Sequence, residues 1–191
     1  DPDLVLDYME PGADLVMLAV PPDEIKAKII EIIEKIRQNQ EAQGLGEKRV
    51  VSVIIISSGF SEIKGDAGRG NNREQEIKAL AEEARSAGVE INVIGPNGMG
   101  AFTPRYYGFF VPHSRVNTGK VEPEKRWPVA IISNSGGWIL KIMDRIPVRV
   151  ALGAGKCMDV SPADLLSAVT AHRKELGIDV IALYLEGFDT L

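Results

Sequence analysis

The chain has 191 residues, of which 45% are hydrophobic and 26% are charged, so its composition is that of a folded protein rather than a disordered one. Its 22 basic and 27 acidic residues give a net charge of −5, which argues against a general binder of nucleic acid or anionic membranes, because such binding needs clustered cations. The single cysteine, Cys157, excludes an intrachain disulfide, and no apolar run is long enough to span a bilayer. We expect a soluble, cytoplasmic α/β protein.

Six short apolar runs predict the strands of the fold. They are rich in β-branched residues and apolar on both faces, as is typical of central strands in a parallel sheet that is covered on both sides. These runs lie at residues 14–20, 49–56, 89–94, 128–132, 148–152 and 179–185.

The stretches between the first strands show helical periodicity. Five of the six isoleucines within residues 25–36 recur at helical spacing and form one apolar stripe: Ile25, Ile29, Ile32, Ile33 and Ile36. A second helix is predicted over 73–87, where Asn72 and Gln75 resemble an N-cap with its reciprocal partner and Gly88 stands at the position of a left-handed stop.

Two further helices are predicted in the second half of the chain. One runs over 162–176, with Ser161 as its cap, Pro162 at its first position and Gly177 at its end. A shorter helix is expected after Gly137.

The alternation of strands and helices is typical of doubly wound parallel sheets. It occurs twice, in residues 1–103 and 128–191, and the two units are joined by a linker of residues 104–127 that is rich in aromatic and basic residues. The first unit lacks an opening glycine-rich strand–turn–helix and the second stops soon after its last strand. We therefore expect a fragment of a longer polypeptide.

Ligands of open parallel sheets bind at the carboxyl ends of the strands. Loops rich in glycine, serine and proline follow all six predicted strands. Each loop alone fits ordinary turn chemistry, but six loops at corresponding positions favour a binding site. They lie at residues 20–22, 57–62, 95–100, 133–137, 153–156 and 186–187.

Residues 133–137 open a helix directly after a strand, where free backbone N–H groups and the helix dipole favour an anion. The alternative is a helix that is simply capped by Ser135, and both interpretations fit this one serine. Residues 153–156 do not form a nucleotide-binding P-loop, because Val150 stands where that motif needs glycine and Cys157 where it needs a hydroxyl.

The remaining reactive side chains give weaker signals. His113 and His172 have no spacing typical of a metal site or an activated nucleophile, and we expect both to be solvated. Cys157 lacks a positioned base, so no metal or thiol chemistry is predicted. Glu186 follows the last strand and is either a functional carboxylate or a surface turn residue.

Several segments, in this order, resemble the NDP-forming acyl-CoA synthetases, the superfamily of succinyl-CoA synthetase. They are DLVMLAVPP at 14–22, IISSGFSE at 55–62, IGPNGMG at 94–100, VAIISNSG at 129–136, DVSPADLL at 159–166 and IALYLEGF at 181–188. The resemblance implies alpha-subunit-like domains: a partial Rossmann-like CoA-binding domain over 1–103 and a partial flavodoxin-like ligase domain over 128–191.

The resemblance also implies a reaction and its site residues. The reaction interconverts acyl-CoA, ADP and phosphate with a carboxylate, CoA and ATP through an acyl phosphate and a phosphohistidine. In this sequence Glu186 matches the catalytic carboxylate that supports the phosphohistidine. The matching binding residues are Ser133, Ser135 and Gly136 for the phosphoryl group, Val20, Pro21, Pro22, Ser58, Gly59 and Phe60 for CoA, and Pro96, Asn97 and Gly98 near the thiol and acyl group.

The implied partners include parts that this chain does not contain. ATP or ADP with Mg²⁺ is expected to bind mainly to an ATP-grasp domain or a beta subunit, in a homo- or hetero-oligomer. The family's phosphorylated histidine lies in a loop that has no counterpart here, and neither His113 nor His172 matches it. The alternative function is therefore a non-catalytic CoA- or acyl-CoA-binding regulatory module of the same fold.

Overall fold

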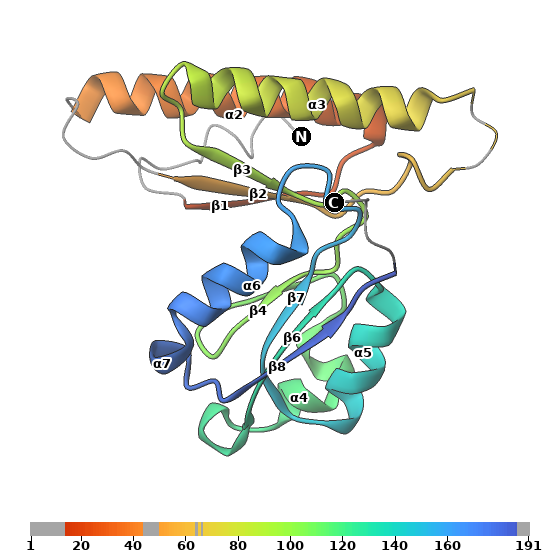
Figure 1. Cartoon of the computed structure of the whole chain (residues 1–191), viewed down its shortest axis with the longest axis vertical. Helices are drawn as coiled ribbons and strands as arrows, with labels where there is room; N and C mark the ends of the chain where they lie inside the picture. Colours follow the sequence, from red (N-terminus) through yellow and green to blue (C-terminus); the bar gives the residue numbers. More distant parts are fainter. Residues whose placement is uncertain (1–13, 44–49, 64, 66, 187–191) are drawn as a thin grey trace.

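Two β-sheets organise the chain, and each is the centre of its own α/β unit (Figure 1). The computed structural model describes residues 14–63, except 44–49, and residues 65 and 67–186. The first sheet is parallel, in the order β1-β2-β3, and both of its helices cover the same face (Figure 1). Its elements are β1 (Leu15–Leu18), α2 (Pro22–Gln43), β2 (Val51–Ile55), α3 (Arg69–Ser86) and β3 (Ile91–Ile94).

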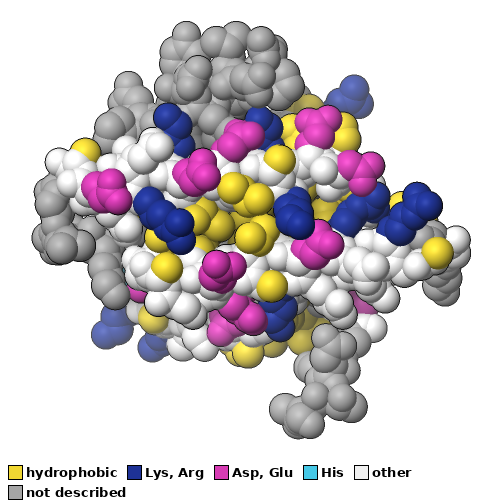
Figure 2. Space-filling model, turned by 90° about the horizontal axis from the view of Figure 1, so that it is seen from above, with side chains coloured by type: hydrophobic (Ala, Val, Ile, Leu, Met, Phe, Trp, Pro, Cys, Tyr) yellow, Lys and Arg dark blue, Asp and Glu magenta, His cyan; other side chains and the backbone are white. Residues whose placement is uncertain are grey.

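The predicted isoleucine stripe anchors α2 to this sheet. All five of its side chains are buried in one core with the inward residues of the strands. Burial of one such side chain is worth about 1.5–3 kcal/mol, so the stripe accounts for much of the attachment of α2. Figure 2 shows the opposite, outer face of α2 and α3, where acidic and basic side chains are interspersed around an apolar seam between the helices.

Helix α3 begins four residues before its predicted start. Gly68 is the N-cap residue, at φ 79°, and no side chain caps the helix there. The predicted cap, Asn72, lies inside the first turns, and its N–H donates to the Gly68 carbonyl (3.0 Å). The prediction was wrong because the left-handed glycine turns the chain into the helix without a side-chain cap. The predicted stop is confirmed, since Gly88 has φ 85°.

The second sheet is mixed, in the order β5-β4-β7-β6-β8. Strands β6 (Trp127–Ser133), β7 (Val148–Gly153) and β8 (Val180–Tyr184) are parallel, as predicted. Strands β4 (Gly100–Phe102) and β5 (Tyr107–Phe109) form a hairpin that pairs antiparallel with β7. The predicted strands thus form the parallel part of this sheet, and the hairpin adds an antiparallel edge that the sequence did not predict.

The segment expected as a linker contributes to the second sheet. It contains β5, whose Phe109 is buried together with Phe102 of β4 in the core beneath α5 (Gly136–Arg145). The chain then continues through short helical turns to β6. These turns are η1 (His113–Arg115), α4 (Asn117–Lys120) and η2 (Pro123–Lys125).

Helices cover both faces of the second sheet. Helix α5 (Gly136–Arg145) packs on the face that carries Ile131, and α6 (Pro162–Ala171) packs on the face that carries Ile132. The predicted third helix divides at His172 into α6 and α7 (Arg173–Leu176). Its predicted ends are confirmed: Ser161 and Asp164 form a reciprocal capping box, and Gly177 closes α7 at φ 65°.

The loop after β7 ties the two units together. The Val160 N–H donates to the Val93 carbonyl (3.2 Å), and the Val93 N–H donates to Asp159 Oδ2 (2.9 Å). Arg85, on α3, donates to both carboxylate oxygens of Asp159 (2.7 and 3.1 Å). The bond to Asp159 also raises the pKa of Arg85. Among the described helices, none is both long and apolar enough to cross a membrane.

Candidate functional site at the facing sheet edges

The carboxyl ends of the first sheet's strands are joined by hydrogen bonds between their loops. Ser57 Oγ, after β2, donates to the Val20 carbonyl after β1 (2.5 Å). The Asn97 N–H, after β3, donates to the Ser57 carbonyl (3.0 Å). The three loops that the family resemblance assigns to CoA and its thiol therefore lie side by side at one edge.

This line of loops continues into the second sheet. The Lys156 N–H, after β7, donates to the Pro96 carbonyl (2.9 Å). Asn134 Nδ2, after β6, donates to the Gly155 carbonyl (2.7 Å), and the Asn134 N–H donates to the Tyr184 carbonyl at the end of β8 (3.3 Å). The carboxyl edges of both sheets thus face one another, as Figure 1 shows where β1–β3 approach β7 and β8.

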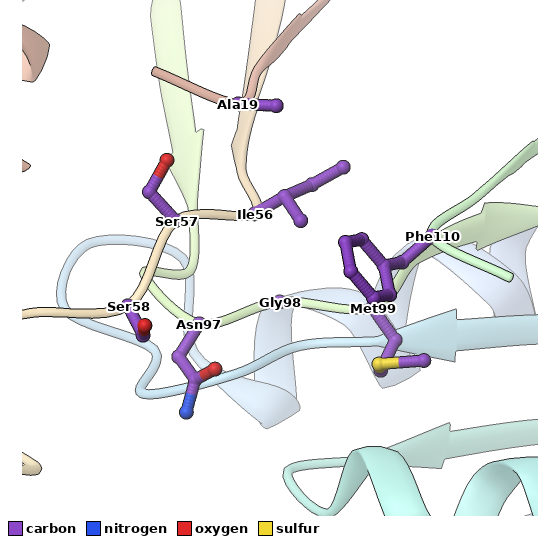
Figure 3. Close-up of a pocket in the computed structure, with 8 residues that line it drawn as sticks. All are labelled: Ala19, Ile56, Ser57, Ser58, Asn97, Gly98, Met99 and Phe110. Atoms are coloured by element: carbon purple, nitrogen blue, oxygen red, sulfur yellow. The ribbon is translucent and has the colours of Figure 1, made fainter. Parts of the chain in front are cut away.

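A pocket of about 290 Å³ opens where the first sheet meets the β4–β5 hairpin (Figure 3). Apolar side chains form most of its wall, together with two serines and one asparagine. None of the described side chains that line it is charged. The lining residues are Ala19, Ile56, Ser57, Ser58, Asn97, Gly98, Met99 and Phe110.

Two acidic side chains hold the loop after β2. The Glu62 carboxylate accepts the N–H groups of Gly59 (2.5 Å) and Phe60 (3.2 Å), and the Glu74 carboxylate accepts the Ser61 N–H (3.0 Å). The Phe60 side chain is fully buried in the first core, so this residue meets the site only through its backbone. Charge-assisted bonds to three successive N–H groups give the loop a fixed shape.

The same loop is attached to the start of α2. Arg73 donates to the Gly59 carbonyl (2.7 Å) and also forms an ion pair with Asp23 in the first turn of α2. Gly59 itself has φ 108° and lies against Pro22. The segment at Pro22 and the loop that contains Gly59 are therefore held together by direct contacts.

The segment that leads into α5 contains a buried serine and a glycine that faces open space. Ser133 is fully buried, and its hydroxyl oxygen accepts the Ser135 N–H (2.9 Å). Ser135 occupies the N-cap position of α5, but its side chain makes no capping hydrogen bond. Gly137 borders open space, since a Cβ added there would meet no atom within 4 Å. The first turn of α5 therefore presents backbone N–H groups at an accessible surface.

Glu186 lies at the same sheet edge as this loop. Strands β6 and β8 are parallel neighbours with Ser133 opposite Tyr184, so the chain leaves both strands in the same direction. Glu186 is exposed there, and Gly187 lies outside the described residues. The two histidines lie elsewhere and are exposed: His113 is in η1, and His172, between α6 and α7, is 3.5 Å from Glu175.

No family model matches the chain, but individual proteins do. It is 31% identical over 183 residues to the ADP-forming acetate–CoA ligase II subunit alpha of Pyrococcus furiosus, covering 93% of this chain and 33% of that protein. It is 32% identical over 174 residues to subunit alpha of ligase I from the same organism, covering 87% and 33%. It is 29% identical over 191 residues to the ADP-forming acetate–CoA ligase of Methanocaldococcus jannaschii, covering 96% and 22%.

The chain is homologous to part of the ADP-forming acyl-CoA ligases. The resemblance seen in the order of its sequence motifs is thereby confirmed. This ligase homologue spans about a third of the length of the two Pyrococcus relatives that it matches.

Several residues of the candidate site were not singled out from the sequence. Glu62 was visible only as part of a motif, and its role as acceptor for the loop depends on the turn that the loop makes. Asn134 bridges two loops, while its Oδ1 is buried without a protein partner. Met99 and Phe110 line the pocket, although Phe110 lies in the segment that was expected to be a linker.

Proposed function

We propose that the chain supplies the CoA-binding and phosphoryl-binding parts of an ADP-forming acyl-CoA ligase. The whole enzyme would interconvert an acyl-CoA, ADP and phosphate with a carboxylate, CoA and ATP. The observation that carries this proposal is the hydrogen-bonded line of loops from Val20 to Asn134, with a pocket beside the loops of the first sheet. It connects the residues that the resemblance assigns to CoA with those that it assigns to phosphate.

The pocket suits the thiol end of CoA and an attached acyl group. The pantetheine arm combines apolar carbons with amides, and the lining combines apolar walls with Ser57, Ser58 and Asn97. Pro96 and Gly98 are buried, so packing holds the backbone of this loop in place beside the exposed Asn97 side chain. The proposal assigns residues 20–22 and 58–60 to the CoA body and residues 96–98 to the thiol and acyl end.

The first turn of α5 suits the phosphoryl group. Its N–H groups and the helix dipole stabilise negative charge, and the Ser135 hydroxyl adds a donor. Ser133 acts indirectly, because its buried hydroxyl holds the Ser135 backbone in place. In the ligase direction the CoA sulfur would form a bond to the acyl carbon of the acyl phosphate, and the bond from that carbon to the phosphate oxygen would break. The thiol proton would end on the released phosphate, which leaves toward this helix.

Glu186 is assigned to the histidine step of the same proposal. A carboxylate that accepts from one ring nitrogen of histidine leaves the other nitrogen as the nucleophile. The histidine, the nucleotide and Mg²⁺ would come from an ATP-grasp domain, a beta subunit or another part of the polypeptide. Two of the relatives are named as alpha subunits, which supports the proposal of a second subunit.

The test uses the complete polypeptide with any partner subunit, incubated with γ-labelled ATP and, separately, with CoA. Glu186→Gln should lower protein phosphorylation at least about tenfold while CoA affinity measured by calorimetry stays the same. Glu175→Gln, an exposed carboxylate on α7, is the matched control and should change neither. CoA binding without phosphorylation or thioester formation in the wild type would instead indicate the regulatory module.

A further inference from the structure

Met99 and Phe110 form one side of the pocket as a pair. They flank the β4–β5 hairpin, and the Phe110 N–H donates to the Met99 carbonyl (2.9 Å). This bond holds the two residues next to each other on the hairpin side. In Figure 3 the Phe110 ring stands above Met99, while Ile56 and Ala19 lie across the pocket on the first sheet's loops. The pocket is thus bounded on opposite sides by these two residue pairs.

Met99 can lie between the pocket and α5 because two neighbouring residues are glycines and leave room for its side chain. A Cβ on Gly136, the first residue of α5, would lie 2.6 Å from Met99 Cγ and 2.7 Å from Met99 Sδ. A Cβ on Gly153, the last residue of β7, would lie 2.5 Å from Met99 Cβ. The Met99 side chain therefore packs directly on the backbone at Gly136 and Gly153. It separates the first turn of α5 from the pocket.

The exposed Phe110 ring is placed to contact an apolar ligand in the pocket. Its side chain is 66% exposed, although the neighbouring Phe102 and Phe109 are buried in the second core. An exposed aromatic ring at a pocket wall gains free energy when an apolar group covers it, at about 25 cal/mol for each Å² removed from water. Of the groups in the proposed reaction, the acyl chain is the most apolar, since the pantetheine arm also carries amides.

We propose that Met99 and Phe110 determine which acyl groups the enzyme accepts. This inference rests on the proposed function and adds two specificity-determining residues to it. Phe110 limits the width of the acyl group at the mouth of the pocket. Met99 limits its depth and holds the acyl carbon on the pocket side of α5, next to the phosphoryl group bound at that helix.

The expected size of the effect follows from apolar pockets in general. One methylene group more or less in such a pocket changes kcat/KM by roughly 10–200-fold. Phe110→Ala and Met99→Ala each remove more than one methylene, so each should move the preference toward bulkier acids. Because the lining described above carries no charge, this selection operates on the size and shape of the acyl chain.

The experiment compares acyl groups of increasing bulk with the complete enzyme. The kcat/KM for acetyl-CoA, isobutyryl-CoA and phenylacetyl-CoA is measured with ADP and phosphate for the wild type, Phe110→Ala and Met99→Ala. Phe110→Leu and Met99→Leu keep the pocket filled and protect the test against loss of folding. Trp127→Ala is the control, since this exposed ring lies at the other end of β6. CoA affinity is measured in parallel by calorimetry.

A rise of about tenfold or more in the ratio of bulky to small acyl-CoA turnover in the alanine variants, a smaller rise in the leucine variants and no change in Trp127→Ala would support the inference. Unchanged ratios in an enzyme that binds CoA and makes thioesters would overturn it and leave the proposed function standing. Failure of the wild type to bind CoA or acyl-CoA would overturn the proposed function and, with it, this inference.

Discussion

Gly59 lies directly against the ring of Pro22. A Cβ on Gly59 would come within 2.6 Å of Pro22 Cγ, and the backbone at Gly59 has φ 108°. The two loops assigned to CoA therefore touch at a point that has room only for glycine and a conformation that favours it. Since Arg73 also joins this loop to the first turn of α2, a shift at Gly59 would move both loops together.

Gly59→Ala should weaken CoA binding at least about tenfold and lower the free energy of unfolding by about 2–4 kcal/mol. The loss combines backbone strain with overpacking against Pro22. Calorimetry with CoA and thermal unfolding measure the two effects. Gly88→Ala is the matched control, because Gly88 has φ 85° but nothing within 4 Å of an added Cβ. It should cost only about 1 kcal/mol and leave CoA affinity unchanged. Equal behaviour of the two variants would contradict the packing argument.

A second prediction concerns the ion pair that joins the units. The Asp159 side chain is 7% exposed and accepts from Arg85 and from the Val93 N–H, so Asp159→Asn should lower the free energy of unfolding by about 1–3 kcal/mol. Glu122→Gln is its control: Glu122 pairs with Lys125, but both side chains are about two-thirds exposed or more (67% and 72%). Such surface pairs contribute about 0–1 kcal/mol. Denaturant unfolding that shows the same loss in both variants would contradict the prediction.

A third prediction concerns acid. The hydrogen bond from the Ser161 hydroxyl, with one from the Ser161 backbone, lowers the pKa of Asp164 below its ordinary value. A carboxyl whose pKa is lower in the folded state stabilises the fold above its unfolded pKa, and this contribution is lost as the pH falls through the folded pKa. Ser161→Ala should cost about 0.5–2 kcal/mol at pH 7 through loss of the cap.

The acid test compares the wild type with Ser161→Ala from pH 7 downward. The difference in Tm between the two proteins should shrink as Asp164 is protonated in both. Thr170→Ala, in the same helix and away from the capping box, should show a pH-independent difference. A Ser161→Ala difference that stays constant to pH 3 would show that the capping box does not depend on the Asp164 charge.

Much of the fold could be predicted because its strands carry their own signal. The six β-branched runs became β1, β2, β3, β6, β7 and β8, with ends shifted by a few residues at most. Strands β4 and β5 carry no such signal: each has three residues, and Gly100 and Gly108 lie within them. They are strands because they pair with each other and with β7, and a contact between distant segments cannot be read from a local pattern.

The residues of the candidate site could likewise be predicted only in part. The rule that ligands meet the carboxyl ends of parallel strands led to the loops that the structure brings together. It led to Met99 only as one member of the 95–100 loop and did not lead to Phe110, because the place of both side chains beside the pocket depends on the β4–β5 hairpin. Nor could the sequence show that Ser133 is buried while Ser135 is half-exposed, since both serines precede the same helix.

That difference between the serines carries the last prediction. The Ser133 hydroxyl accepts the Ser135 N–H and has no exposed surface, so Ser133→Ala leaves that N–H without its acceptor. An unsatisfied group of this kind costs about 1–3 kcal/mol, and the loop that carries the first turn of α5 should loosen. Ser133→Ala should therefore lower both the Tm and the extent of phosphorylation of the complete enzyme.

Ser135→Ala should separate these two effects. The Ser135 side chain makes no capping hydrogen bond, so its removal should leave the Tm within about 2 °C of the wild type. It removes one proposed donor to the phosphoryl group while the backbone donors remain, so phosphorylation should fall by only about tenfold or less. Thermal unfolding and labelling with γ-labelled ATP measure both quantities in the same preparations. The assignment of loop support to Ser133 and phosphoryl binding to Ser135 is wrong if Ser133→Ala keeps the wild-type Tm. It is also wrong if Ser135→Ala loses more stability than Ser133→Ala.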